Sequence, residues 1–409
     1  MTSPRAWLLA LLLIAGGLFA AYRIVAVTQA DRWALEDPQR ALQWVPRHPM
    51  ALLNLAGQQL HAGRVDDAQS TARRLLAVEP LEGCGFRILA EAAALQGDDD
   101  KALALYRIAA QRSPRDVPTS AWLTEHFLVA GDYPAALEQI DVILRTSPSY
   151  GATLLPLMAK LALDPVFAAD LARVLEQRPR WRSRLLSTLH RSDDPRAADA
   201  VMSALRSEGG LSEAEFDEWI AYLLRQNRWG EAYSRWASSI DIEGGKLPLV
   251  YNGRFEQPVS GRGFDWRMTR IPGVSLEFVP DRSATGLSAH ASFRGRPVPQ
   301  VNLEQPLLLA PGEYRFTARM RADALRSDRG LEWNITCAGS AGSLASSDQV
   351  EGTFGWRTVG MDVTVPVTNC HGQWLRLRNP APKGSAQQVS GDVWFDDVTI
   401  EPRINRRNN

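Results

Sequence analysis

Hydrophobic and polar positions follow three different patterns along the 409 residues. An uncharged apolar run comes first, and from about residue 31 apolar positions recur at the spacing of an α-helix. Beyond residue 248 the period changes from 3.6 to 2, which is typical of β-strands. We therefore predict an α+β multidomain protein: an N-terminal transmembrane helix or signal segment (1–30), an all-α solenoid (31–241), a linker (242–248), an antiparallel β-sandwich (249–402) and a tail (403–409).

The first segment has the composition of a membrane helix. Residues 6–22 carry no charge, and about 17 apolar residues are just enough to cross a hydrocarbon core about 30 Å thick. Trp7 and Tyr22 stand at the two ends, where aromatic side chains favour the membrane interface. We favour a membrane anchor. The alternative is a cleaved signal peptide with a cut near Ala20 or Ala21, and the sequence leaves it open.

Three landmarks recur every 34 residues after this segment. A glycine permits a left-handed turn between two helices, a small alanine lets the second helix pack closely, and a proline ends the unit. The positions are Gly63, Gly97 and Gly131, then Ala68, Ala102 and Ala136, then Pro80, Pro114 and Pro148. Ala34 and Pro46 lie one step upstream, so the array begins close to the apolar segment.

This helix-turn-helix unit resembles the tetratricopeptide repeat over about residues 31–150. Residues 151–211 lack the landmarks but keep a helical pattern. Local signals extend the helices to about residue 240: Asp164 and Asp194 as N-caps before proline, the capping box of Ser212 and Glu215, and a degenerate repeat copy at Asn227, Ala232 and Trp236. We predict one continuous right-handed solenoid.

The resemblance implies that the concave surface of the solenoid binds a protein partner. The first-helix positions that would line this groove are Leu53, Arg87, Glu91 and Glu125. The Lys and Asn set of the carboxylate-clamp subgroup does not occur there, so capture of a chaperone C-terminus is not expected. The alternative, that these charged side chains are only a solvated surface, stays open.

The C-terminal part predicts short strands by strict alternation. Tyr314, Phe316 and Ala318 alternate with Arg315 and Thr317, and further segments behave in the same way. Turn signals such as Pro311-Gly312 separate them. Several strands of this kind predict an antiparallel sandwich of about 150 residues.

Both ends of this sandwich carry a recognisable frame. Residues 251–256 read Tyr-Asn-Gly-Arg-Phe-Glu, and residues 392–400 contain Trp394 and the pair Asp396-Asp397. The frame is similar to the galactose-binding-like jelly rolls of carbohydrate-binding modules. The resemblance implies a possible structural calcium held by Glu256 and Asp397, because Ca²⁺ takes oxygen ligands. The alternative is that the aspartates cap or form salt bridges locally.

The same alternation places polar side chains opposite the core, where they can form a glycan-binding face. Indole rings stack on sugars, and guanidinium groups pair with uronate carboxylates, so an acidic polysaccharide would fit. The candidates are Trp374, Arg376, Arg378, Arg315, Arg319 and Trp394, alongside His290, Asn302 and Asn334. The alternative is that this side packs against something else, for instance the solenoid.

Charge and cysteine content narrow the function. Lys+Arg and Asp+Glu both number 46, so bulk charge does not attract nucleic acid. Of the three cysteines, Cys337 and Cys370 could pair in an oxidising compartment, whereas Cys84 lies on a solenoid helix. The histidines are scattered singly, no Cys-x-x-Cys occurs, and nucleophile-elbow and phosphate-loop motifs are absent from the sequence. We expect no enzymatic activity and no certain cofactor.

Together these features predict a bacterial inner-membrane protein with one span and its bulk in the periplasm. Its expected role is that of a scaffold in exopolysaccharide or capsular polysaccharide assembly or export. The solenoid would bind a protein partner such as a polymerase or export component, and the jelly roll would bind glycan. The alternative is a purely protein-protein assembly factor with a structural jelly roll.

Overall fold

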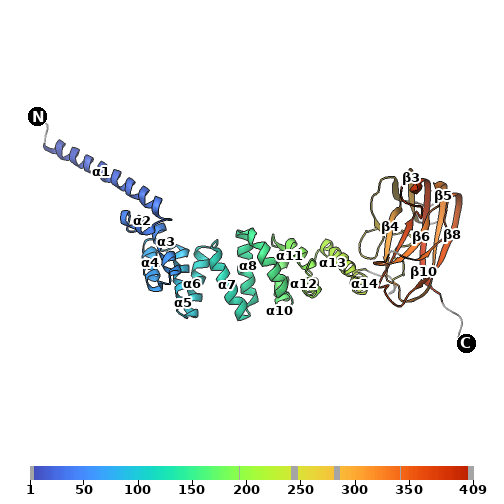
Figure 1. Ribbon diagram of the computed structural model, residues 1–409, viewed down its shortest axis with the longest axis horizontal. Helices are drawn as coiled ribbons and strands as arrows, with labels where there is room; N and C mark the ends of the chain where they lie inside the picture. The colour runs from blue at the N-terminus through green and yellow to red at the C-terminus, as the bar shows by residue number, and fades with distance from the viewer. Residues whose placement is uncertain (1–3, 193, 241–246, 281–285, 341, 404–409) are drawn as a thin grey trace. The chain divides into compact units, whose positions relative to one another are not determined.

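A computed structural model describes residues 4–192, 194–240, 247–280, 286–340 and 342–403 (Figure 1). Helices come first and two antiparallel sheets follow, which confirms the predicted fold class. Most of the predicted linker and of the tail lies outside the described residues. Two compact units divide the chain, one from Met1 to Leu211 and the other from Ser212 to Asn409. The last helical pair therefore belongs to the same unit as the sheets.

Helix α1 (Pro4–Trp33) contains the apolar segment and continues beyond it. Its part from Leu11 to Trp33 is long and apolar enough to cross a membrane, a pattern that a signal sequence also shows. Ala26 and Ala30 are buried, and Ala30 packs in a small cluster with residues of α2 (Pro38–Trp44) and α3 (Pro49–His61). The end of α1 is therefore part of the first helical layer.

The 34-residue landmarks mark helix pairs, as predicted. The pairs are α3 with α4 (Val65–Val78), α5 (Gly83–Leu95) with α6 (Asp99–Arg112), and α7 (Val117–Ala130) with α8 (Tyr133–Thr146). Gly63, Gly97 and Gly131 have φ values of 73°, 77° and 73°, in the left-handed region that favours glycine. Each landmark alanine of the second helices is fully buried. A larger side chain at these positions would push the helices apart.

The helices beyond the regular repeats begin where the local signals predict. After the short 3₁₀ turn η1 (Pro148–Tyr150), the series runs α9 (Gly151–Leu161), α10 (Pro165–Glu176), α11 (Arg182–His190), α12 (Pro195–Ser207), α13 (Glu213–Arg225) and α14 (Trp229–Ala237). Asp164 and Asp194 accept hydrogen bonds from the first turns of α10 and α12. Ser212 and Glu215 form the capping box of α13.

The C-terminal sandwich consists of two five-stranded antiparallel sheets. The first has the order β1-β4-β9-β6-β7, and the second has the order β2-β3-β10-β5-β8. The strands are β1 (Arg267–Met268), β2 (Val274–Pro280), β3 (Leu287–Pro297), β4 (Gln300–Leu307), β5 (Gly312–Ser327), β6 (Glu332–Cys337), β7 (Ser343–Ser346), β8 (Gly352–Val365), β9 (Gln373–Arg378) and β10 (Gln388–Pro402), with η2 (Ser385–Gln387) before the last. Between the sheets lies a core with Phe255, Trp266, Trp333 and Phe395 at its centre, all fully buried.

The two parts of the frame at the ends of the sandwich meet in space. The Val398 N–H donates to the Gly253 carbonyl oxygen at 2.9 Å. A Cβ on Gly253 would lie 2.0 Å from the Val398 carbonyl oxygen, so only glycine fits there. Cys337 and Cys370 form a disulfide between the end of β6 and the loop before β9. The first and last segments of the sandwich are thus joined by the backbone hydrogen bond, and β6 is joined to the loop before β9 by the disulfide.

Candidate functional site

The predicted glycan-binding residues lie on two faces of the sandwich. β9 carries Trp374, Arg376 and Arg378 in the first sheet, whereas β5 carries Arg315 and Arg319 and β10 carries Trp394 in the second. The prediction of a single shared face is therefore wrong. Alternation tells whether a side chain points to the core, but not to which sheet its strand belongs.

On the outer face of the second sheet, Trp394 stands between two neighbouring side chains. His290 of β3 stacks on its ring with centroids 4.4 Å apart, and Arg321 of β5 lies 4.3 Å from the ring centroid. Both are direct cross-strand partners of Trp394, one on each side. Asp392 fixes the His290 ring through a 2.8 Å hydrogen bond. Because both ring faces are occupied, Trp394 does not offer a stacking surface to a sugar.

The two predicted arginines of this face are already paired. Arg315 forms an ion pair with Asp362 at 3.0 Å, and Arg319 forms one with Asp397 at 3.2 Å. Arg254 contacts the other carboxylate oxygen of Asp397 at 3.3 Å. A carboxylate held between two guanidinium groups does not suit a calcium ion, which prefers an uncompensated set of oxygens. Within the described residues no group of three or more potential metal ligands occurs.

Asp396, the residue before Asp397, is buried, and the pKa of its carboxyl is raised. Its Oδ1 accepts a hydrogen bond from the Asp397 N–H at 2.7 Å. Burial raises the pKa of its carboxyl to about 6, because the charged form loses hydration. The pair therefore acts locally at the bulge in β10, which is the alternative that the sequence left open.

On the outer face of the first sheet, Arg376 and Arg378 are also neutralised. The Arg376 Nε donates to Glu304 at 2.6 Å, and Arg378 pairs with the buried Glu332 at 2.7 Å. The Asn334 amide nitrogen likewise has partners in β7: it donates to the hydroxyls of Ser343 and Ser346 and to the Ala345 carbonyl oxygen. The side chain of Asn302 lies outside the described residues.

Trp374 lies in a pocket of about 670 Å³ between the first sheet and the helical pair α13–α14. Trp229 at the start of α14 meets its ring edge to face, with centroids 5.5 Å apart and planes at 85°. The Arg267 guanidinium lies 4.9 Å from the Trp374 centroid. Arg225, Asn227, His371 and Asn369 complete the polar part of the lining. The described lining residues include no Asp or Glu.

The helical side of this pocket is held in place by aromatic packing between α14 and the sandwich. Phe264 packs against Trp229, Tyr233 and Trp236, with ring centroids 6.0, 5.0 and 5.5 Å away. A Cβ on Gly372 would lie 2.0 Å from the Trp229 ring, so α14 can approach the loop before β9 this closely only because residue 372 is glycine. These aromatic contacts hold α14 against the sandwich.

Arg267 is a partly buried cation of the pocket. Burial lowers the pKa of Arg267 from its usual value, whereas the nearby Glu304 carboxylate opposes the shift. An arginine pKa starts so high that the side chain still carries its charge at neutral pH. The Arg267 Nη2 donates to the Gly263 carbonyl oxygen at 3.3 Å. A fixed cation therefore lies beside the Trp374 ring.

Sequence reasoning identified Trp374 but missed most of this pocket. Trp229, Arg225 and Arg267 come from α14, α13 and β1, which are far from β9 in the chain. Two signals pointed to them: the aromatic content of the last helical pair, and the glycines at 263 and 372 beside aromatic neighbours. Neither signal has a fixed spacing, so only the packing shows that these residues line one cavity.

The predicted solenoid groove residues have different environments. Arg87 donates to Glu91 at 2.6 Å on the same helix and contacts Asp116, the N-cap of α7, at 3.0 Å. Glu125 is exposed, whereas Leu53 is half-buried and packs on the core between α3, α4 and α5. Arg87 thus joins α5 to the start of α7, while Glu91 holds the Arg87 guanidinium from the same helix.

The aspartates and the free cysteine of the helices have structural partners. Asp98 caps α6 by accepting a hydrogen bond from the Lys101 N–H. Asp99 and Asp100 lie in the first turn of α6, where their negative charges interact favourably with the helix dipole. Burial raises the pKa of the Cys84 thiol to about 11, with the Asp116 carboxylate adding to the shift. A thiol with so high a pKa is a poor nucleophile at neutral pH.

Comparison with known proteins gives structural neighbours for both parts. No protein-family model matches the chain, and no curated protein matches it. A structure titled "CBM4 structure and function" is 17% identical over 38% of this chain and 99% of its own, with a TM-score of 0.30. A thermophilic tetratricopeptide-repeat protein of Thermus thermophilus is 23% identical over 45% of this chain and 94% of its own, with a TM-score of 0.26. MamA is 12% identical over 47% and 98%, with a TM-score of 0.26. The neighbours thus include tetratricopeptide-repeat proteins and carbohydrate-binding modules.

Proposed function

We propose that the C-terminal unit binds an acidic glycan in the pocket of Trp374. The observation that carries this proposal is the lining: two indole rings, two cations and two amide side chains, with no carboxylate among the described lining residues. A volume of about 670 Å³ is that of a small-ligand pocket, for which about 300–1,000 Å³ is typical. Guanidinium groups match uronate carboxylates in a planar, two-point geometry.

The affinity of the full chain for polysaccharides tests this proposal. In affinity electrophoresis in detergent, polygalacturonate in the gel retards the protein, whereas neutral dextran does not. Arg225 is exposed at the end of α13, so Arg225→Gln removes charge from the pocket without disturbing the core. Losing one charge-assisted hydrogen bond weakens binding by about tenfold to a hundredfold.

The matched control is Arg329→Gln, which removes the same charge from an exposed loop residue outside the pocket lining. It retains wild-type retardation. Trp374→Phe, which keeps an aromatic ring but shortens the contact, gives an intermediate affinity. Equal retardation of the Arg225 and Arg329 variants, or equal retardation by dextran, is incompatible with this pocket as the glycan site.

We further propose that the chain is a non-enzymatic scaffold anchored in the bacterial inner membrane, with its bulk in the periplasm. Support comes from α1, which continues without a break through Ala20 and Ala21 into a buried helical layer. Cleavage there would leave a free helix end beside the layer that contains Ala30. The helical repeats would hold a protein partner of exopolysaccharide or capsular assembly while the sandwich binds the polymer. Edman sequencing of the protein purified from membranes begins at residue 1 or 2 if α1 is retained.

A second candidate function is a purely protein-protein assembly factor with a structural sandwich. The specific observation in its favour is that Arg315, Arg319, Arg376 and Arg378 are all in ion pairs. Their charges are largely compensated and offer little to an acidic glycan. Retardation by no polysaccharide, from a protein with its native circular dichroism spectrum, favours this function.

A further inference from the structure

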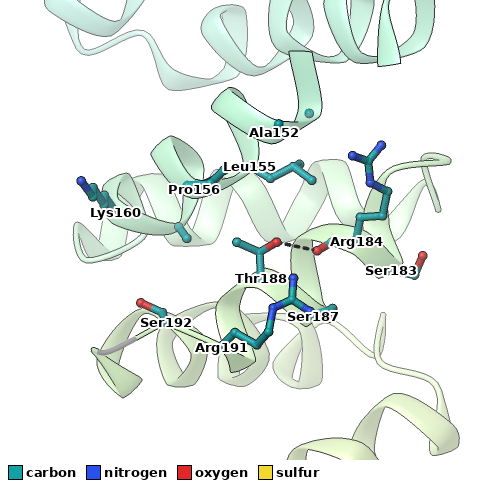
Figure 2. Close-up of a pocket in the computed structure, with 12 residues that line it drawn as sticks. Ala152, Leu155, Pro156, Lys160, Ser183, Arg184, Ser187, Thr188, Arg191 and Ser192 are labelled. Carbon is teal, nitrogen blue, oxygen red and sulfur yellow. Dashed lines mark hydrogen bonds between the residues drawn. The ribbon is translucent and has the colours of Figure 1, made fainter. Parts of the chain in front are cut away.

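A second, open pocket of about 680 Å³ lies between α9 and α11, in the helices after the repeats (Figure 2). In Figure 2, Leu155 and Pro156 lie on one side of it, and Thr188 and Arg191 lie on the other. Arg184 borders the same space. The wall thus combines an apolar surface from α9 with hydroxyl and guanidinium groups from α11.

The charged side chains among the described residues that line this pocket are all positive. Lys160, Arg184 and Arg191 line it, and neither α9 nor α11 contains an acidic residue. Within the described residues none of these three cations forms an ion pair. Arginines on neighbouring helices do so, for instance Arg173 with Asp170 and Arg145 with Asp141. The described lining of the pocket therefore contains three positive charges and no acidic side chain.

Hydrogen-bond donors lie next to the cations. The Arg191 Nη1 donates to the Ser187 hydroxyl at 2.5 Å, which orients the guanidinium along α11. Ser183 and Ser192 add two further hydroxyl groups to the lining. Side-chain hydroxyls and guanidinium N–H groups together are the donors that oxyanions such as phosphate and carboxylate accept from.

The glycine that begins α9 makes room for one of the cations. A Cβ on Gly151 would lie 2.8 Å from the Arg184 Nη2, so the guanidinium packs against the backbone of α9 only because residue 151 has no side chain. The first turn of α11 also borders the pocket at Ser183 and Arg184, and its N-cap residue Trp181 makes no side-chain cap hydrogen bond. Cations, hydroxyls and a helix start therefore converge on one cavity.

We propose that this pocket is a binding site for an oxyanion, either a phosphate group or the carboxylate of a uronate. It lies in the unit that contains α9 and α11 and does not depend on the glycan pocket of Trp374. A ligand with an apolar face beside its anionic group would contact Leu155 and Pro156 as well.

Isothermal titration calorimetry of the full chain in detergent tests the site, with two probes at constant ionic strength. Inorganic pyrophosphate represents the phosphate source, and trigalacturonate represents the carboxylate source. The wild type binds at least one of them at a site sensitive to α11. The double variant Arg184→Gln with Arg191→Gln binds that probe at least about tenfold more weakly, because two charged donors are lost.

Two controls separate this site from general charge and from the glycan pocket. Arg180→Gln removes an exposed cation just before α11 that does not line the pocket. Arg225→Gln removes a cation of the Trp374 pocket. Both control variants leave the calorimetric affinity for pyrophosphate unchanged. If Arg225→Gln abolishes the binding of trigalacturonate and the double variant does not, that binding belongs to the Trp374 pocket.

The choice of probe that binds identifies the source of the anion. Pyrophosphate binding lost in the double variant indicates a phosphate site, and trigalacturonate binding lost in it indicates a uronate site. The proposal is overturned if neither probe binds the wild type, or if the double variant, with native circular dichroism, binds every probe that the wild type binds just as tightly.

Discussion

The contact between Gly372 and Trp229 allows a sharp test of how α14 is held on the sandwich. Gly372 is buried just before β9, and a Cβ there would lie 2.0 Å from the Trp229 ring. Trp229 is only 3% exposed, and it packs against Trp374 and Phe264, so it cannot shift without losing these contacts. The substitution Gly372→Ala therefore forces the ring out of its place or displaces the helix.

The expected cost follows from the contacts that are lost. Inserting a methyl group into a packed interior costs about 1–3 kcal/mol. The edge-to-face contacts of Trp229 with Trp374 and Phe264 contribute about 0.5–1.5 kcal/mol each. The sum is a loss of about 2–6 kcal/mol in the free energy of unfolding, which for a unit of this size lowers Tm by about 4–24 °C.

Thermal unfolding followed by near-ultraviolet circular dichroism measures this loss. The matched control is Gly355→Ala in β8, where an added Cβ meets nothing within 4 Å. This control keeps the Tm of the parent protein within about 2 °C. A double-mutant cycle with Trp229→Ala isolates the contact, because removing the ring gives the new methyl group space.

Two outcomes would refute the reasoning. One is a Gly372→Ala variant that unfolds at the same temperature as Gly355→Ala. The other is a cost that is unchanged in the Trp229→Ala background, since the clash with that ring is then not its cause.

Three further predictions concern stability. Because burial raises the pKa of Asp396 to about 6, its contribution to folding is complete below about pH 4 and is lost as the pH rises through 6; Asp396→Asn, which keeps the acceptor oxygen, flattens the urea midpoint against pH over this window. Reduction of the Cys337–Cys370 disulfide, which closes a loop of 33 residues, lowers the free energy of unfolding by about 3–4 kcal/mol, as measured by urea titration with and without reductant. Asp164→Ala lowers the urea midpoint more than Tyr133→Phe, because it removes both the cap of α10 and the 2.6 Å bond from the Tyr133 hydroxyl; equal midpoints would contradict this.

Local chemistry determines the helical part of this protein. The 34-residue spacing predicts the helix pairs because each landmark acts within a few residues of itself: glycine at the left-handed turn, alanine at the close contact, aspartate at the cap. The Ser212–Glu215 capping box predicts the start of α13 in the same way. Signals of this kind depend only on residues close together in the chain, so the sequence alone reveals them.

Alternation likewise determines which residues form the core of the sandwich, but it does not determine their neighbours. Arg376 and its partner Glu304 are 72 residues apart, and Arg319 and Asp397 are 78 apart. Only the strand order brings these groups together and compensates their charges. The sequence alone therefore overstates how much free positive charge the sandwich offers to a ligand.

The two pockets mark the limit between sequence and tertiary structure. Trp374 could be singled out from its strand, and residues 151–211 as helical from their pattern, because amphipathic periodicity is a property of single elements. Which groups face Trp374 depends on how closely α14 approaches β9, and the absence of a side chain at Gly372 sets that distance. Similarly, Arg184 reaches α9 only because Gly151 leaves space. The sequence determined the elements, whereas the close packing of residues distant in the chain decided where cavities remain and which charges line them.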